Sequence, residues 1–197
     1  MLPSTLTLEL PDELTLYVTQ EQFELLAAAN RDLKLERTAV GQLIVNPPAG
    51  GESGQRNFNI IGQLAHWYEE YEELGVGFDS STGFRLPNGA NRSPDASWVS
   101  RERWDSLTPE QKKGFVPLCP DFAIELRSET DRLTKLQAKM QEYIDNGTQL
   151  GWLIDPKNRR VEISRSGEEV EILENPPRLS GEDILPGFIL NLKRVWI

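Results

Sequence analysis

The feature that most constrains the fold is a strand–helix–strand run between residues 121 and 155. Residues 121–126 alternate as a strand, residues 131–146 form an amphipathic helix that ends at Asn146-Gly147, and residues 150–155 are apolar on both faces. Two strands joined through a helix are parallel, and such strands lie inside a sheet that is covered on both faces. The run therefore predicts an α/β fold with a parallel crossover in the middle of the sheet.

The residues before this run predict an added N-terminal strand–helix segment and a long helix. A strand is expected ahead of Thr19, where residues 19–22 fit a capping box for a short helix, and residues 33–37 alternate as a strand that pairs with residues 42–45. After the loop 47–51, a helix is expected from about residue 52 to residue 74. Its apolar stripe consists of Phe58, Ile61, Leu64, Ala65, Tyr68 and Leu74.

Glycine, proline and asparagine clusters divide the remaining chain into short strands. Residues 76–79, 83–86 and 95–99 predict an antiparallel meander, a small helix begins at Thr108-Pro109, and the C-terminal part predicts a hairpin around Ser166-Gly167. The tail 184–196 is expected to close a sheet edge. We therefore expect one domain over residues 1–197, with a core at about 45–165.

Composition excludes several classes of site. The chain has one cysteine, Cys119, and one histidine, His66, which excludes a disulfide framework and Cys/His zinc sites. No apolar run is long enough to span a bilayer, and residues 1–5 carry no Lys or Arg ahead of an apolar segment. We therefore expect a cytoplasmic protein without a membrane partner, whose chemistry depends on carboxylates, Lys and Arg.

The net charge of −10 disfavours a protein that binds nucleic acid through its overall charge. The charge is uneven, because residues 125–165 sum to +1 and the rest of the chain to −11. An anion is therefore expected to dock on the second half of the chain.

The strand 121–127 carries the most informative chemistry. Its period places Asp121, Glu125 and Arg127 on one face. Burying carboxylates there costs several kcal/mol unless they are paired or bind a cation. Two interpretations stay open from these residues alone: an ion pair between Glu125 and Arg127 at the sheet edge, or a metal site.

Two further residues extend the metal-site interpretation. Asp95 opens the strand 95–99, and if that strand neighbours residues 121–126, Asp95 and Glu125 meet at one end. Two carboxylates with substrate phosphate and water suit Mg²⁺. Lys139 lies on the flank of the apolar face of the helix 131–146, from which its ammonium can reach the sheet.

The sequence resembles the Uma family of restriction-endonuclease-like proteins, in the PD-(D/E)XK nuclease superfamily. The resemblance spans about residues 45–165 in four stretches that lie in register: 93–99, 120–128, 139–147 and 151–156.

The resemblance implies a restriction-endonuclease-like mixed sheet and a dimeric, Mg²⁺- or Mn²⁺-dependent DNA endonuclease acting on double-stranded DNA. Asp95 and Glu125 match the metal ligands of the superfamily. Arg127 stands where the superfamily pattern has a lysine, and the resemblance to Uma-like proteins implies that Lys139 on the following helix takes the place of that lysine. The resemblance also implies a glutamate on the first core helix, for which Glu52 and residues 69–73 are candidates. Phosphate contacts are expected from Arg127, Arg132 and Lys135.

Two alternatives stay open beside the endonuclease. One is a catalytically inactive relative that binds nucleic acid or protein, which the net charge favours. The other is an unrelated α/β enzyme that uses carboxylates on a small phosphoester.

Overall fold

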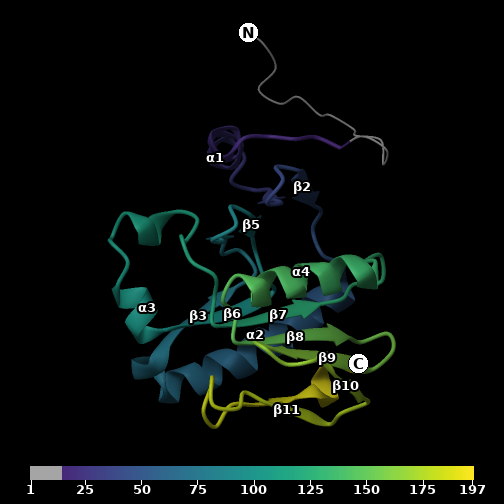
Figure 1. Ribbon diagram of the computed structural model, residues 1–197. Coiled ribbons are helices and arrows are strands. Elements are labelled where there is room, and N and C mark those ends of the chain that lie inside the picture. Colours follow the sequence, from purple (N-terminus) through teal and green to yellow (C-terminus); the bar gives the residue numbers. More distant parts are fainter. Residues whose placement is uncertain (1–14) are drawn as a thin grey trace.

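A six-stranded mixed sheet forms the centre of the computed structural model, which describes residues 15–197 (Figure 1). Its strand order is β10-β9-β8-β7-β6-β3. The strands are β3 (Gly75–Asp79), β6 (Ala96–Ser100), β7 (Phe122–Leu126), β8 (Leu150–Asp155), β9 (Arg160–Arg165) and β10 (Glu171–Glu174). Only β7 and β8 are parallel, and they are joined through α4 (Leu133–Asp145). The mixed α/β fold and the crossover predicted from the sequence are confirmed.

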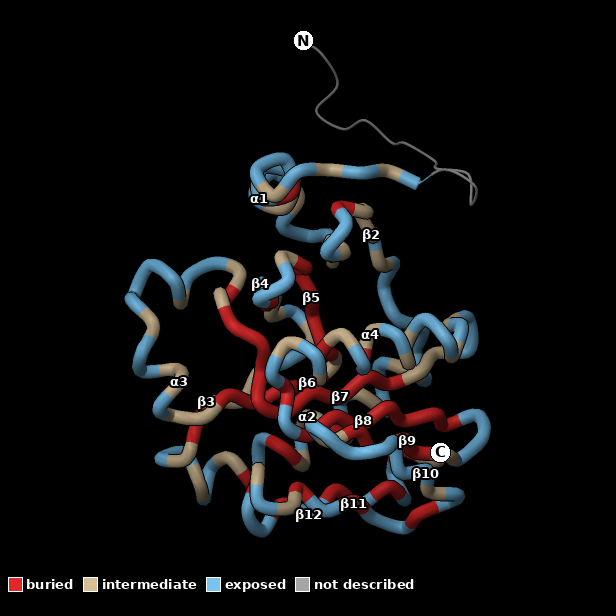
Figure 2. Tube along the Cα trace, viewed as in Figure 1, coloured by how far each residue is buried: buried red, intermediate tan, exposed pale blue. Residues whose placement is uncertain are grey.

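The two faces of β7 belong to two separate hydrophobic clusters. Phe122, Ile124 and Leu126 pack with α2 (Gly51–Glu70) and the C-terminal segment. Ala123 faces the other side, where Met140 and Tyr143 of α4 cover the sheet. Figure 2 shows the central strands buried along their length between these two layers.

A smaller sheet lies beyond α4, near the N-terminal helix α1 (Gln20–Ala29) (Figure 1). Its order is β2-β1-β5-β4, with β1 (Lys34–Arg37), β2 (Leu43–Asn46), β4 (Phe84–Arg85) and β5 (Asn91–Arg92). The predicted capping box at Thr19 is present, and β1 pairs with β2 as expected. The strand expected ahead of Thr19 falls largely outside the described residues.

The predicted meander is wrong in its middle strand. β3 pairs directly with β6, whereas β4 leaves this sheet and pairs with β5 in the smaller one. The turn residues around β4 are compatible with both arrangements, because turn chemistry fixes where a strand ends and not which sheet it joins. The 3₁₀-helix η2 (Gln111–Lys113) stands where the small helix was expected, after α3 (Arg101–Asp105).

The long helix and the tail also differ from the predictions. The helix ends at Glu70 and is followed by the 3₁₀-helix η1 (Glu72–Leu74); it buries Ile60, Leu64 and Trp67, whereas Phe58 is 78% exposed. The tail forms a separate pair, β11 (Arg178–Ser180) and β12 (Ile189–Asn191), followed by η3 (Leu192–Arg194). These elements cover the α2 side of the core instead of closing the sheet edge, and thereby select which helix face is buried. Within residues 15–197, no helix has both the length and the apolar character needed to cross a membrane.

Candidate active site

Asp95 is held at the start of β6, directly beside β7. Its backbone N–H donates to the carbonyl of Ile124 (2.9 Å), and its Oδ2 accepts from the N–H of Leu126 (2.8 Å). Pro94 has no N–H to continue the ladder, so strand pairing starts at this point. The carboxylate of Asp95 therefore lies against the strand that carries Glu125, as the sequence predicted if β6 and β7 were neighbours.

Glu125 projects from β7 towards α4 and is buried. The Nζ of Lys139 lies 2.8 Å from its Oε1, and the hydroxyl of Tyr143 donates to the same oxygen at 3.0 Å. Lys139 and Tyr143 are four residues apart on α4, so they lie on one helix face. The Glu125 partner is thus Lys139, and not Arg127 as in the alternative interpretation.

Lys139 connects Glu125 with a second carboxylate that the sequence did not single out. Its ammonium donates to Oε1 of Glu36 on β1 at 2.9 Å, and the backbone N–H of Ser93 donates to the same oxygen at 3.0 Å. Arg92 lies 3.4 Å from the other oxygen of Glu36. Glu36 is outside the expected core of about 45–165, and the alternation of residues 33–37 was the only sequence signal for it.

The charges of this cluster follow from burial and from the closeness of the groups. Burial raises the pKa of Glu125 to about 7; Lys139 opposes this effect, and Asp95 and Glu36 add to it. Burial by itself would lower the pKa of Lys139, but Glu125 and Glu36 raise it above its usual range. Burial by itself would raise the pKa of Glu36, but the positive charges of Lys139 and Arg92 lower this pKa below its usual value. Lys139 therefore stays protonated and acts as a hydrogen-bond donor, not as a base.

The oxygen atoms around Asp95 are suited to a hard divalent cation. Asn57 of α2 donates to the carbonyl of Asp95 (3.4 Å), while its own Oδ1 is buried and has no donor within residues 15–197. Asp95, Glu125 and this amide oxygen are all hard ligands, and Mg²⁺ takes one or two carboxylates together with water and phosphate. The described residues contain no group of three or more Asp, Glu, His or Cys side chains placed to hold a metal ion.

The glutamates considered on the first core helix lie elsewhere. Glu52 is exposed and pairs with Arg56 (3.1 Å), and Glu69 faces His66 (3.7 Å between Oε2 and Nδ1) on the helix surface. Residues 70, 72 and 73 are also exposed. Asn57 is the α2 residue that contacts Asp95, so in this chain the helix offers an amide at that place.

The three expected phosphate contacts differ in their surroundings. Arg127 is engaged by Asp155, with 2.6 Å between Nη1 and Oδ2, and also donates to the carbonyl of Asp131. Arg132 and Lys135 are exposed at the start of α4. The geometry therefore leaves Arg132 and Lys135 open to a ligand and gives Arg127 a structural partner.

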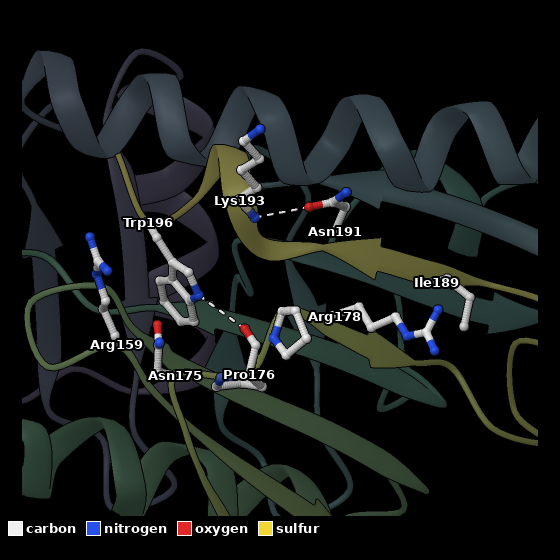
Figure 3. Close-up of a pocket in the computed structure, with 9 residues that line it drawn as sticks. Arg159, Asn175, Pro176, Arg178, Ile189, Asn191, Lys193 and Trp196 are labelled. Carbon is white, nitrogen blue, oxygen red and sulfur yellow. Dashed lines mark hydrogen bonds between the residues drawn. The ribbon is translucent and has the colours of Figure 1, made fainter.

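A pocket of about 790 Å³ near the C-terminus lacks the groups for hydrolysis. Arg159, Arg178, Lys193 and Trp196 line it, and no carboxylate does. Figure 3 shows the three cationic side chains pointing in different directions, and the Trp196 indole donating to the carbonyl of Pro176. The candidate active site is therefore the cluster around Lys139.

Comparison with solved structures shows that the fold is similar to that of a known crystal structure. A crystal structure from Anabaena variabilis ATCC 29413, titled a "putative nuclease belonging to DUF820", matches with a TM-score of 0.69. The match covers 82% of this chain and 89% of that chain, at 20% sequence identity. No curated protein matches.

The family follows from the sequence match. The family Uma2, described as "Putative restriction endonuclease", matches residues 20–193, and the chain belongs to this family. The resemblance seen in the sequence is thereby confirmed, and the family implies a nucleic-acid substrate.

Proposed function

We propose that this protein is a divalent-metal-dependent DNA endonuclease, which hydrolyses phosphodiester bonds at the cluster of Asp95, Glu125 and Lys139. The single observation that carries the proposal is the position of the Lys139 ammonium, 2.8 Å from Glu125 and beside the strand junction that holds Asp95. The family match and the nuclease fold support it.

Asp95 and Glu125 would hold the metal ion at the end of β6 and β7. Mg²⁺ or Mn²⁺, when bound, polarises the phosphate and lowers the pKa of a bound water. Leu126 donates its N–H to Oδ2 of Asp95, which fixes the orientation of that carboxylate. The Asn57 oxygen, which is buried and has no donor among residues 15–197, would add a neutral ligand or a partner for a bound water.

Lys139 would stabilise the negative charge that develops on the phosphate. Its raised pKa keeps it protonated at neutral pH, and a fixed cation in a site with little water stabilises charge strongly. Glu36 binds the same ammonium and holds it in place, together with the carbonyl of Ser93 (3.4 Å). In this role Lys139 donates a hydrogen bond and does not remove a proton.

Plasmid nicking at low salt, with Mg²⁺ or Mn²⁺, tests the proposal. We expect the wild-type protein to nick plasmid and EDTA to stop it. Asp95→Ala, Glu125→Ala and Lys139→Ala should each lose activity, and their circular dichroism spectra should remain those of a folded protein. Glu129→Gln, a change of an exposed carboxylate in the loop after β7, is the matched control and should remain active.

Activity that persists in all three variants would contradict the assignment. DNA binding without any cleavage by the wild-type protein would instead favour the inactive, binding-only relative. The dimer predicted from the sequence, which would bring two sites to the two strands of a duplex, is checked by light scattering.

A further inference from the structure

A second hollow of about 1070 Å³ lies between the N-terminal elements and the loops around α3. One wall comes from α1 and β1 (residues 24–35), and the other from residues 80–85 and 110–117. We call this hollow the cationic groove. A volume of this size is close to the upper end for a site that binds one drug-sized ligand.

The cationic groove has a positive balance in a protein whose net charge is −10. Five basic side chains line it against three acidic ones: Arg31, Lys34, Arg85, Lys112 and Lys113 against Glu24, Asp32 and Glu110. The ion pairs that these cations form are long: Arg85 lies 3.6 Å from Glu24, and Lys112 lies 3.9 Å from Asp105. Within residues 15–197, Arg31 and Lys113 form no ion pair, so they are available to phosphate groups.

One end of the cationic groove reaches the candidate active site. Lys34, which lines the groove, lies 3.5 Å from Oδ1 of Asp95. Ser93, also in the lining, contacts both Glu36 and Lys139 through its backbone. The side chain of Asp95 is 23% exposed and that of Glu125 only 4%, so Asp95 is the more accessible of the two carboxylates.

Aromatic side chains form the other part of the lining. Phe78, Trp104 and Phe115 are half-buried in the walls, and Nζ of Lys112 lies 4.9 Å from the centre of the Trp104 ring. Cations beside aromatic rings are typical of sites that bind single strands, because unpaired bases stack on the rings while phosphates meet the cations. A duplex keeps its bases stacked inside, so the aromatic walls would gain little from it.

We propose that the cationic groove binds one unpaired strand of the nucleic-acid substrate and leads its phosphate to Asp95, with Arg31, Lys112 and Lys113 as backbone contacts. This inference rests on the proposed nuclease function and refines its substrate. The double-stranded substrate expected from the sequence then has to be open, frayed or overhanging where it enters the groove.

Fluorescence anisotropy with EDTA present, so that no strand is cut, tests this inference. The probes are a labelled mixed-sequence oligodeoxynucleotide, its blunt duplex, and the same duplex with a single-stranded overhang. We expect the single strand and the overhang to bind about tenfold more tightly than the blunt duplex, which is the contribution of roughly one stacked base. The double variant R31A/K113A should bind more weakly and lower the salt slope by roughly 0.7 for each lost phosphate contact.

Lys193→Ala, which removes an exposed cation outside the groove, is the matched control and should bind like the wild type. Equal or tighter binding of the blunt duplex, or an unchanged salt slope in R31A/K113A, would overturn the inference. The nicking assay separates this failure from that of the proposed function. If cutting depends on Glu125 but R31A/K113A binds DNA like the wild type, only the inference about the cationic groove is refuted. If binding depends on the cationic groove but the wild-type protein cuts no DNA, only the proposed nuclease function is refuted.

Discussion

Glu125→Gln should stabilise the folded protein at about pH 8 and have a much smaller effect on its stability at about pH 5, in the absence of divalent metal. Glutamine has nearly the same size as glutamate, and its Oε1 can still accept from Lys139 and Tyr143, which bind this atom in the wild type. The substitution therefore removes a buried negative charge without removing the acceptor.

The magnitude follows from the pKa of Glu125, which burial raises from 4.5 to about 7. Between these two values the folded state binds a proton that the unfolded state has lost, so wild-type stability falls as the pH rises from about 4.5 through 7. A difference of this size corresponds to roughly 3 kcal/mol above pH 7. The pKa values of Glu36 and Asp155 are lowered instead, so their contributions change below this window.

Urea unfolding of the wild type and of Glu125→Gln, in EDTA and at several pH values between about 5 and 8, measures the effect. Glu129→Gln, an exposed change, should follow the wild type at every pH. Parallel pH profiles for the wild type and Glu125→Gln, or a less stable Glu125→Gln at the alkaline end, would show that burial does not raise the pKa of Glu125. The expected gain in stability with loss of nicking would mark Glu125 as a residue kept for function.

Three further substitutions probe the surroundings of the cluster. Glu36→Gln weakens the interaction that positions Lys139 and should lower kcat about 10–100-fold, an effect typical of a residue that orients a ligand. The affinity for a single strand in EDTA should stay unchanged, and a matching loss of affinity would contradict this positioning role. Arg127→Met breaks the pair with Asp155 and should lower the free energy of unfolding by about 2–4 kcal/mol in urea, whereas normal stability with a lower salt slope would make Arg127 a phosphate ligand instead. Gly151→Ala places a Cβ on the Met140 sulfur and should cost about 1–3 kcal/mol in thermal unfolding; Gly77→Ala, where a Cβ meets nothing within 4 Å, is its control and should cost less.

Short-range patterns in the sequence were sufficient to predict much of the candidate site. The alternation of residues 121–126 and the helix that follows predicted a parallel crossover, and with it Glu125 and Lys139 on facing surfaces. The turn before Asp95 predicted the start of a strand, and the pairing of β6 with β7 placed this residue beside Glu125. These predictions hold because strand and helix periods decide which side chains share a face before any tertiary contact forms.

Other features depended on contacts between distant parts of the chain. Glu36 reaches Lys139 across 103 positions because β1 joins β5 in a sheet that no local pattern specified. Arg127 is drawn to Asp155 on the parallel neighbour strand, although Glu125 lies two residues away.

The sequence by itself determined the parallel crossover, the faces of its strand and helix, and three candidate site residues. The tertiary structure decided which face of α2 is buried, the fourth candidate residue, Glu36, and the partner of each buried charge. The physical reason is the cost of leaving a charge buried and unpaired, which only the complete set of neighbours can offset.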